Sequence, residues 1–393
     1  MSPPETAPWE RQPIVIRFSE TTKFVETYGF SGSQGMVTLE GQRLLPETHS
    51  ETVYLFMHPS ATLQMLPMPQ ALADAGIHVI CAASRYPKND TALIMEKVIA
   101  DLGQYVRYAR EELGYSKVIL VGWSGGGSLS LSYQSQAEAP SITHTPAGDE
   151  YDLVAAKLQP ADGVIFIAAH LSRAETLTEW LDPSVTNELD PDERDQELDI
   201  YSANCPHRAP FSADFVQHFR TAQIARNRRI TAWVDELIDR LAKRNDGEIE
   251  RAFIVHRTMC DVRWIDPSID PNGRKPNWTY LGDPRVANSA PAGLARCTSL
   301  RSWLSQWSYD RTQAKGVDGA RRIKNTPVLQ IENQADDAVP ATHNPIIHAA
   351  LATADKEMVS INGATHYYAG QPEHMAQCID AVIDWSRRKG LLA

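Results

Sequence analysis

The sequence predicts an α/β protein built on a mostly parallel sheet with helices on both faces. Short apolar segments bounded by turn residues alternate along the chain with amphipathic helical patterns. One apolar run, residues 117–121, leads straight into a glycine-rich turn at residues 122–126 and then into a run of small residues. Short strands that are apolar throughout are typical of a parallel sheet covered on both sides. These observations together indicate a doubly wound α/β architecture.

The predicted strands follow one another in three groups. Residues 14–18 and 36–39 form an antiparallel edge, and their connection holds Gly29, Gly32 and Gly35. Buried strands then follow at residues 53–57, 78–82, 118–121 and 163–168. The pattern resumes near the end of the chain with strands at residues 328–331 and 358–361. The last part of the chain is therefore expected to complete the sheet begun by the first.

Helices fill the gaps between the strands. The clearest lies at about residues 91–113, where one stripe holds Ile94, Val98, Leu102, Val106 and Ala109. Asn89 and Asp90 precede it, and either could cap its first turn. An amphipathic helix at about residues 372–388 closes the chain.

A long insertion interrupts the alternating pattern after about residue 171. It is rich in proline and helical patterns and separates the core regions 1–170 and 321–393, so we assign residues 171–320 to a largely helical cap. Its sequence is rich in tryptophan, with Trp180, Trp264, Trp278, Trp303 and Trp307. Most of these tryptophans are expected in a core, and part of the surface of the insertion should line a pocket over the sheet. A long amphipathic helix is indicated by Phe215, Phe219, Trp233, Leu237 and Leu241. The basic cluster at residues 226–229 is interpreted as the solvent-exposed face of a helix.

Composition limits the classes of partner. The formal charge of −11 argues against nucleic acid or an anionic membrane as the main partner, because both would repel the chain. The sequence has no signal-peptide pattern and no membrane-length apolar run, so we expect a cytoplasmic protein without a membrane span. Five scattered cysteines without a CxxC pair indicate neither a disulfide framework nor a thiolate metal site, and we expect no metal and no cofactor.

The turn at residues 122–126, Gly-Trp-Ser-Gly-Gly, has the spacing of a nucleophilic serine. A serine at the apex of a sharp strand-to-helix turn is strained, and small residues on either side let the strand and the helix pass closely. The turn would raise the Ser124 hydroxyl above the sheet edge, where the Gly125 amide could stabilise an oxyanion. A plain βα turn or a phosphate-binding glycine loop would be the alternatives, although the spacing is not GxGxxG.

A serine nucleophile needs a base, and the base needs an acceptor that holds its tautomer. His366 follows the last predicted strand and would arrive at the same sheet edge as Ser124, with His374 as a minor rival. The acid should come from the loop after residues 328–331. Asp336 is the preferred candidate and Asp337 the next, since either could instead cap a helix near Pro340.

Serine, acid and histidine in this chain order resemble the α/β-hydrolase superfamily. The resemblance covers about residues 10–170 and 325–393. It rests on the motifs around Ser124 and His366 and on Asp336-Asp337-Ala338-Val339-Pro340, which is similar to the family's Asp-x-x-Val-Pro loop. The register of that loop favours Asp336 over Asp337 as the acid. The resemblance implies an eight-stranded sheet with a cap inserted after the sixth strand.

The resemblance also implies a second oxyanion donor after the third strand, where the family often has His-Gly. This chain has His58-Pro59-Ser60-Ala61 there, and Pro59 has no N–H to donate. Ser60 then becomes the expected backbone donor beside Gly125, with Ala61 as the alternative. His58 is expected to shape the loop, and His170 to border the pocket or pack under the cap.

These residues predict a serine hydrolase that acts on a small, fairly apolar ester or lactone through an acyl-enzyme. Thioesters, amides, carbamates and carbon–carbon bonds could be cleaved by the same residues. A hydrolase-fold protein that only binds a small ligand is the alternative from another class, and a nicotinamide-dependent oxidoreductase is a distant third. The sequence leaves the oligomeric state open.

Overall fold

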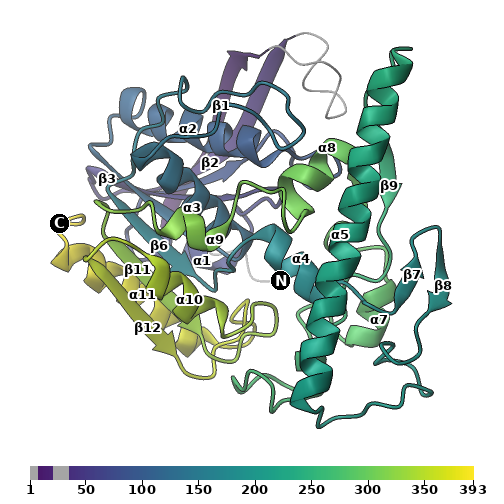
Figure 1. Cartoon of the computed structure of the whole chain (residues 1–393). Helices are drawn as coiled ribbons and strands as arrows, with labels where there is room; N and C mark the ends of the chain where they lie inside the picture. The colour runs from purple at the N-terminus through teal and green to yellow at the C-terminus, as the bar shows by residue number, and fades with distance from the viewer. Residues whose placement is uncertain (1–7, 21–34) are drawn as a thin grey trace, which may run out of the picture.

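The central feature of the fold is an eight-stranded sheet, seen in a computed structural model that describes residues 8–20 and 35–393. Its order is β1-β2-β4-β3-β5-β6-β11-β12 (Figure 1). The strands are β1 (Trp9–Ser19), β2 (Met36–Pro46), β3 (Thr52–His58), β4 (Val79–Ala83), β5 (Lys117–Trp123), β6 (Gly163–Ile167), β11 (Val328–Asn333) and β12 (Lys356–Ile361). All eight predicted strands are present. Gly29 and Gly32 lie outside the described residues.

Strand direction follows the prediction. β1 and β2 pair antiparallel, β2 pairs antiparallel with β4, and every pair from β4 to β12 is parallel. The carboxyl ends of β3, β5, β6, β11 and β12 therefore meet along one edge. In an open α/β sheet this edge is where ligands bind.

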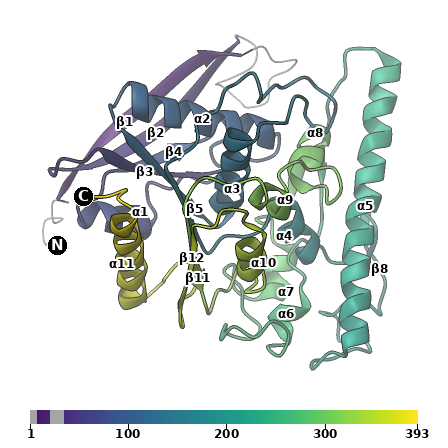
Figure 2. The ribbon, with the colours of Figure 1, turned by 60° about the vertical axis from the view of Figure 1, so that its left-hand side comes forward.

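Two layers of helices cover the sheet (Figure 2). One face carries α1 (Pro67–Asp74) and α11 (Pro372–Arg388), and the other carries α2 (Met95–Glu111), α3 (Gly125–Glu138) and α10 (His343–Ala350). Along β3, Val53, Leu55 and Met57 pack toward the second face, whereas Tyr54 and Phe56 pack toward the first. Because successive strand residues point to opposite faces, one apolar run supplies both cores.

Residues 168–327 form an insertion between β6 and β11, and the cap predicted for residues 171–320 lies within it. Its longest element, α5 (Ala213–Arg244), lies on the side of the insertion away from the sheet (Figures 1 and 2). The other elements are α4 (Arg173–Trp180), β7 (Val185–Asn187), β8 (Asp190–Arg194), β9 (Ala252–Ile254), α6 (Val262–Ile265), α7 (Pro284–Ser289), β10 (Cys297–Ser299), α8 (Leu300–Ser302), the π-helix η1 (Trp303–Trp307) and α9 (Gly316–Ala320). The two antiparallel ribbons, β7–β8 and β9–β10, were not predicted.

Tryptophans build the interior of the insertion. Trp303 and Trp307 are fully buried against α4 and α5, and Trp180 and Trp264 pack in a neighbouring cluster. Trp278 is exposed instead. The expectation that most of these tryptophans form a core therefore holds for four of the five.

The start of α2 corrects one sequence prediction. Neither Asn89 nor Asp90 caps this helix, which begins four residues later than expected, at Met95. The Met95 amide donates instead to Oγ of Ser305, at 2.8 Å. Asp90 accepts a hydrogen bond from Arg173, at 2.5 Å. The acceptor at this helix start comes from the insertion, which local sequence could not reveal.

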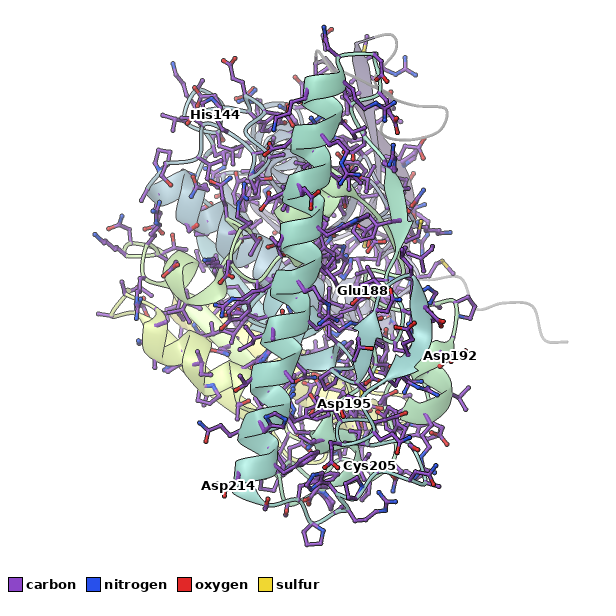
Figure 3. All side chains as sticks on the ribbon, turned by 45° about the vertical axis from the view of Figure 1, so that its right-hand side comes forward. His144, Glu188, Asp192, Asp195, Cys205 and Asp214 are labelled. Atoms are coloured by element: carbon purple, nitrogen blue, oxygen red, sulfur yellow. The ribbon has the colours of Figure 1, made fainter. Side chains whose placement is uncertain are left out.

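The basic cluster at residues 226–229 is also placed differently from the prediction. Arg226 and Asn227 are fully buried, although Arg228 and Arg229 face outward. Arg226 makes a paired contact with Glu188, which lies beside the middle of α5 (Figure 3). Its remaining donors reach the carbonyl oxygens of Asp182 and His256, both at 2.8 Å. A buried guanidinium needs such a full set of acceptors.

The described part of the chain has no helix that is both long and apolar enough to span a membrane.

Candidate active site

The turn between β5 and α3 places Ser124 at its apex. Ser124 has φ +54° and ψ −123°, a strained conformation for a residue other than glycine. The strand and helix pass very closely here: a Cβ on Gly122 would lie 2.6 Å from Cα of Gly127, and one on Gly126 would lie 2.4 Å from the Met57 carbonyl oxygen. Only glycine fits these positions, and Ser124 is left partly exposed at the sheet edge.

Asp336 and His366 meet at the same edge, from the loops after β11 and β12. Nδ1 of His366 lies 2.9 Å from Oδ2 of Asp336, and both side chains are buried. The other carboxylate oxygen accepts hydrogen bonds from the amides of Ala338 and Val339, each at 2.7 Å. A carboxylate only accepts, so Nδ1 of His366 carries the proton and Nε2 is free to act as a base.

Trp123 connects the histidine loop to the serine turn. Its Nε1 donates to the His366 carbonyl oxygen at 3.2 Å, and the two ring centroids are 4.8 Å apart. The residue directly before Ser124 thus supports both the backbone and the ring of His366.

The rival candidates have other contacts. Oδ1 of Asp337 accepts from the His366 amide at 3.4 Å, so this residue touches the backbone of His366. His374 lies in the first turn of α11, where its Nε2 would be 3.3 Å from a Cβ on Gly363. Among the candidates named from the sequence, the imidazole–carboxylate contact is the one between His366 and Asp336.

The expected oxyanion donors differ in their hydrogen bonding. Gly125 is the first residue of α3, so its amide has no acceptor within the helix. The amides of Ser60 and Ala61 both donate to Nδ1 of His58, at 3.2 and 2.9 Å. Each of these two N–H groups is therefore directed at the imidazole, and the oxyanion role of Ser60, with Ala61 as its alternative, stays a prediction. His58 does shape its loop, as expected.

Burial lowers the pKa values of two histidines at this edge of the sheet. Burial, together with the charges of Arg173 and His366, lowers the pKa of His58 to about 3. Burial also lowers the pKa of His170 well below its usual range, assisted by His343 and Arg173. Both imidazoles are therefore neutral at physiological pH. The described residues contain no group of three or more histidine, cysteine, aspartate or glutamate side chains placed to hold a metal ion.

Solved structures resemble this chain over almost its whole length. The α/β hydrolase GrgF from Penicillium sp. sh18 superimposes with a TM-score of 0.52 at 11% identity and covers 96% of this chain and 98% of its own. The chain has the α/β-hydrolase fold. DcsB in complex with a substrate analogue reaches a TM-score of 0.49 at 13% identity, covering 96% of this chain and 99% of its own. No family model and no curated protein matches the sequence.

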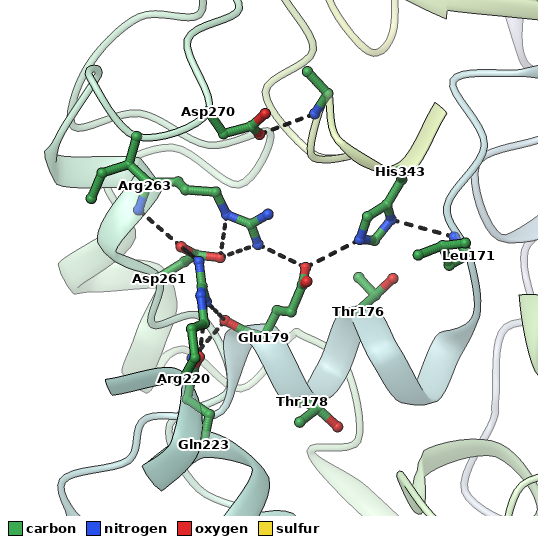
Figure 4. Close-up of polar contacts among 12 residues, drawn as sticks. Leu171, Thr176, Thr178, Glu179, Arg220, Gln223, Asp261, Arg263, Asp270 and His343 are labelled. Carbon is green, nitrogen blue, oxygen red and sulfur yellow. Dashed lines mark hydrogen bonds and ion pairs between the residues drawn. The ribbon is translucent and has the colours of Figure 1, made fainter. Parts of the chain in front are cut away.

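A polar network joins the hydrolase-fold core to the insertion (Figure 4). His343 of α10 accepts from the Leu171 amide through Nδ1, and its Nε2 lies 3.2 Å from Glu179 of α4. Glu179 also pairs with Arg263 at 2.7 Å, and Arg263 pairs with Asp261. Burial alone would raise the pKa of Glu179, but Arg263 and His343 hold that pKa well below its usual range. The first turn after β6 is thus fixed to α10 by charged and hydrogen-bonded groups.

The insertion also reaches the acid and histidine loops. Asn272 donates to the Asp336 carbonyl oxygen at 3.0 Å, and the Tyr280 amide donates to the Asp337 carbonyl oxygen at 3.0 Å. The Tyr280 ring lies 6.2 Å from that of His366. Sequence reasoning named neither residue. Both stand in a proline- and glycine-rich stretch without periodicity, so no pattern in the sequence marked them.

Proposed function

We propose that this chain is a serine hydrolase that cleaves a carboxylic ester or a lactone through an acyl-enzyme on Ser124. The single observation that carries the proposal is the 2.9 Å contact between His366 and Asp336, at the sheet edge where Ser124 lies. GrgF, which superimposes with a TM-score of 0.52, is named as an α/β hydrolase, and this likeness supports a hydrolytic reaction.

In the proposed mechanism the Ser124 hydroxyl attacks the substrate carbonyl while Nε2 of His366 takes its proton. Asp336 holds Nδ1–H of His366 and stabilises the imidazolium that forms. The Gly125 amide donates to the oxyanion. His366 then protonates the leaving alcohol, and water repeats these steps to release the acid.

The insertion at residues 171–320 would act as the cap that shapes the substrate site. Three aromatic rings lie around the His366 ring. The ring centroid of Tyr280, from the insertion, is 6.2 Å from that of His366, and the centroids of Trp123 and Tyr367, from the core, are 4.8 and 5.0 Å from it. This aromatic surrounding supports a small, largely apolar substrate.

The test combines turnover with covalent labelling of the purified full chain. We expect a panel of esters, lactones, thioesters and amides, graded by acyl size, to be hydrolysed most rapidly at an ester or lactone bond. A fluorophosphonate should label Ser124, and Ser124→Ala should lose both turnover and labelling. Ser132→Ala, a buried serine two turns further along α3, serves as the matched control. Full activity of Ser124→Ala, or a label on another residue, would overturn the proposal. A wild-type protein that is neither active nor labelled would instead indicate a ligand-binding protein.

A further inference from the structure

His58 ends β3, directly beside β5, and its ring has a defined tautomer. Nδ1 accepts two backbone N–H groups, from Ser60 and Ala61. An imidazole nitrogen that accepts hydrogen bonds carries no proton, so the proton of neutral His58 is on Nε2. The low pKa, about 3, keeps the ring in this neutral form throughout the physiological range.

The Nε2–H group of His58 has no hydrogen-bond partner in the part of the chain that the structure describes. No acceptor for it is found in residues 8–20 and 35–393, and the side chain is only partly buried. A donor with a fixed direction at the ligand-binding edge is thus available to a bound molecule.

The position of Nε2 relative to α3 shows where this donor lies. A Cβ on Gly125 would be 2.5 Å from Nε2, compared with 3.0 Å from Cδ2 and 3.3 Å from Cε1 of the same ring. Nε2 is therefore, of these three ring atoms, the one closest to the place that a side chain of Gly125, the proposed first oxyanion donor, would occupy. Because Gly125 has no side chain, nothing from that residue separates the imidazole from the start of the helix.

We propose that Nε2–H of His58 is the second oxyanion donor of the site, in place of a backbone amide after β3. The inference rests on the proposed function, because it needs a tetrahedral intermediate on Ser124. When Oγ of Ser124 bonds to the carbonyl carbon, the π electrons move to the carbonyl oxygen and the serine proton moves to Nε2 of His366. His58 keeps its own proton and donates a hydrogen bond to the oxyanion.

This arrangement also explains the sequence His58-Pro59. Pro59 has no N–H, and the next two amides are directed at the imidazole, so the loop backbone presents no free donor from residues 59–61. The same two hydrogen bonds that occupy those amides fix the tautomer that makes the side chain a donor.

Two substitutions separate the loop-shaping role of His58 from the donor role. His58→Asn keeps an acceptor near the position of Nδ1 but has no atom that reaches the position of Nε2, so it presents no donor there. His58→Gln can present an amide N–H near that position. We expect kcat/KM of His58→Asn to fall about 10²- to 10³-fold, the usual effect of losing one oxyanion donor. His58→Gln should retain at least about tenfold more activity than His58→Asn. The matched control is Ser132→Ala.

A thionoester substrate provides a readout that a structural role would not change. Sulfur accepts hydrogen bonds weakly, so the wild-type enzyme should prefer the oxygen ester strongly. In His58→Asn the ratio of oxygen-ester to thionoester rates should fall at least about tenfold.

The outcomes distinguish this inference from the proposed function. If Ser124→Ala keeps its activity, the proposed function fails. If turnover depends on Ser124 but His58→Asn stays within about threefold of wild type, the inference fails alone. It also fails if His58→Asn loses oxygen-ester and thionoester activity equally, since that result indicates a distorted loop.

Discussion

Asp336 uses its two carboxylate oxygens for different partners: Oδ2 contacts Nδ1 of His366 at 2.9 Å, and Oδ1 accepts two amides of its own loop. The loop amides prevent the carboxylate from rotating without the loss of two hydrogen bonds. The orientation of the imidazole is therefore set by the backbone of residues 336–339.

The first prediction concerns the different partners of the two Asp336 carboxylate oxygens. In Asp336→Asn the amide oxygen should stay with Ala338 and Val339, which turns the NH₂ group toward Nδ1 of His366. The imidazole would then carry its proton on Nε2 and could not accept the Ser124 proton, so we expect kcat to fall about 10⁴-fold. Asp337→Asn, measured in the same steady-state assay, should remain within tenfold of wild type. Equal losses in the two variants would contradict the assignment of Asp336.

A second prediction follows from the buried carboxyl group of Glu96. Burial raises its pKa from 4.5 to about 7, although Ser305 and Gln313 donate hydrogen bonds to it. The folded state therefore binds the proton more tightly than the unfolded state, and stability should fall as pH rises from about 4.5 to about 7.

The loss from this one group should reach up to about 3 kcal/mol at pH 8. Glu96→Gln removes the titration while keeping the shape of the side chain. Urea unfolding of both proteins at pH 5 and pH 8 should show a smaller decrease with pH for Glu96→Gln. An identical decrease in the two proteins would rule out the raised pKa.

A third prediction concerns the close approach of α3 to β3. In Gly126→Ala the new Cβ would meet the Met57 carbonyl oxygen at 2.4 Å, and the backbone of a central strand cannot move aside cheaply. We expect a destabilisation of about 2–3 kcal/mol in chemical unfolding. Gly103→Ala in α2 is the matched control, because its Cβ would be tight only against the end of the Leu158 side chain, at 2.7 Å, and in ordinary contact with the Tyr133 ring, at 3.6 Å. Comparable destabilisation in both variants would show that backbone contact is not the cause.

The fourth prediction tests the buried arginine of α5. Arg226→Met removes the donors that Arg226 gives to Glu188 and to the carbonyl oxygens of Asp182 and His256, which should cost about 3–5 kcal/mol. Arg228→Met, two positions along the same helix, removes only an exposed pair with Asp310 and should leave the thermal midpoint nearly unchanged. If the two substitutions have the same effect on the midpoint, the burial of Arg226 is wrong.

The sheet could be predicted from sequence because each strand is a short apolar run that buries both faces. The order of Ser124, Asp336 and His366 along the chain suggested a common edge, and the structure brings the last two into contact, while their catalytic roles stay predictions. Features that depend on distant partners were missed. The burial of Arg226 depends on Glu188, and the direction of the Ser60 amide depends on the rotamer of His58.

The start of α2 has a consequence for the order in which the chain is made. Met95 donates its amide to the hydroxyl of Ser305, a residue 210 positions later. During synthesis on a ribosome, the first turn of α2 must therefore wait for η1 to emerge before this amide finds its native acceptor. Until then the nascent core carries an open helix end, which remains accessible to solvent exchange and to chaperones.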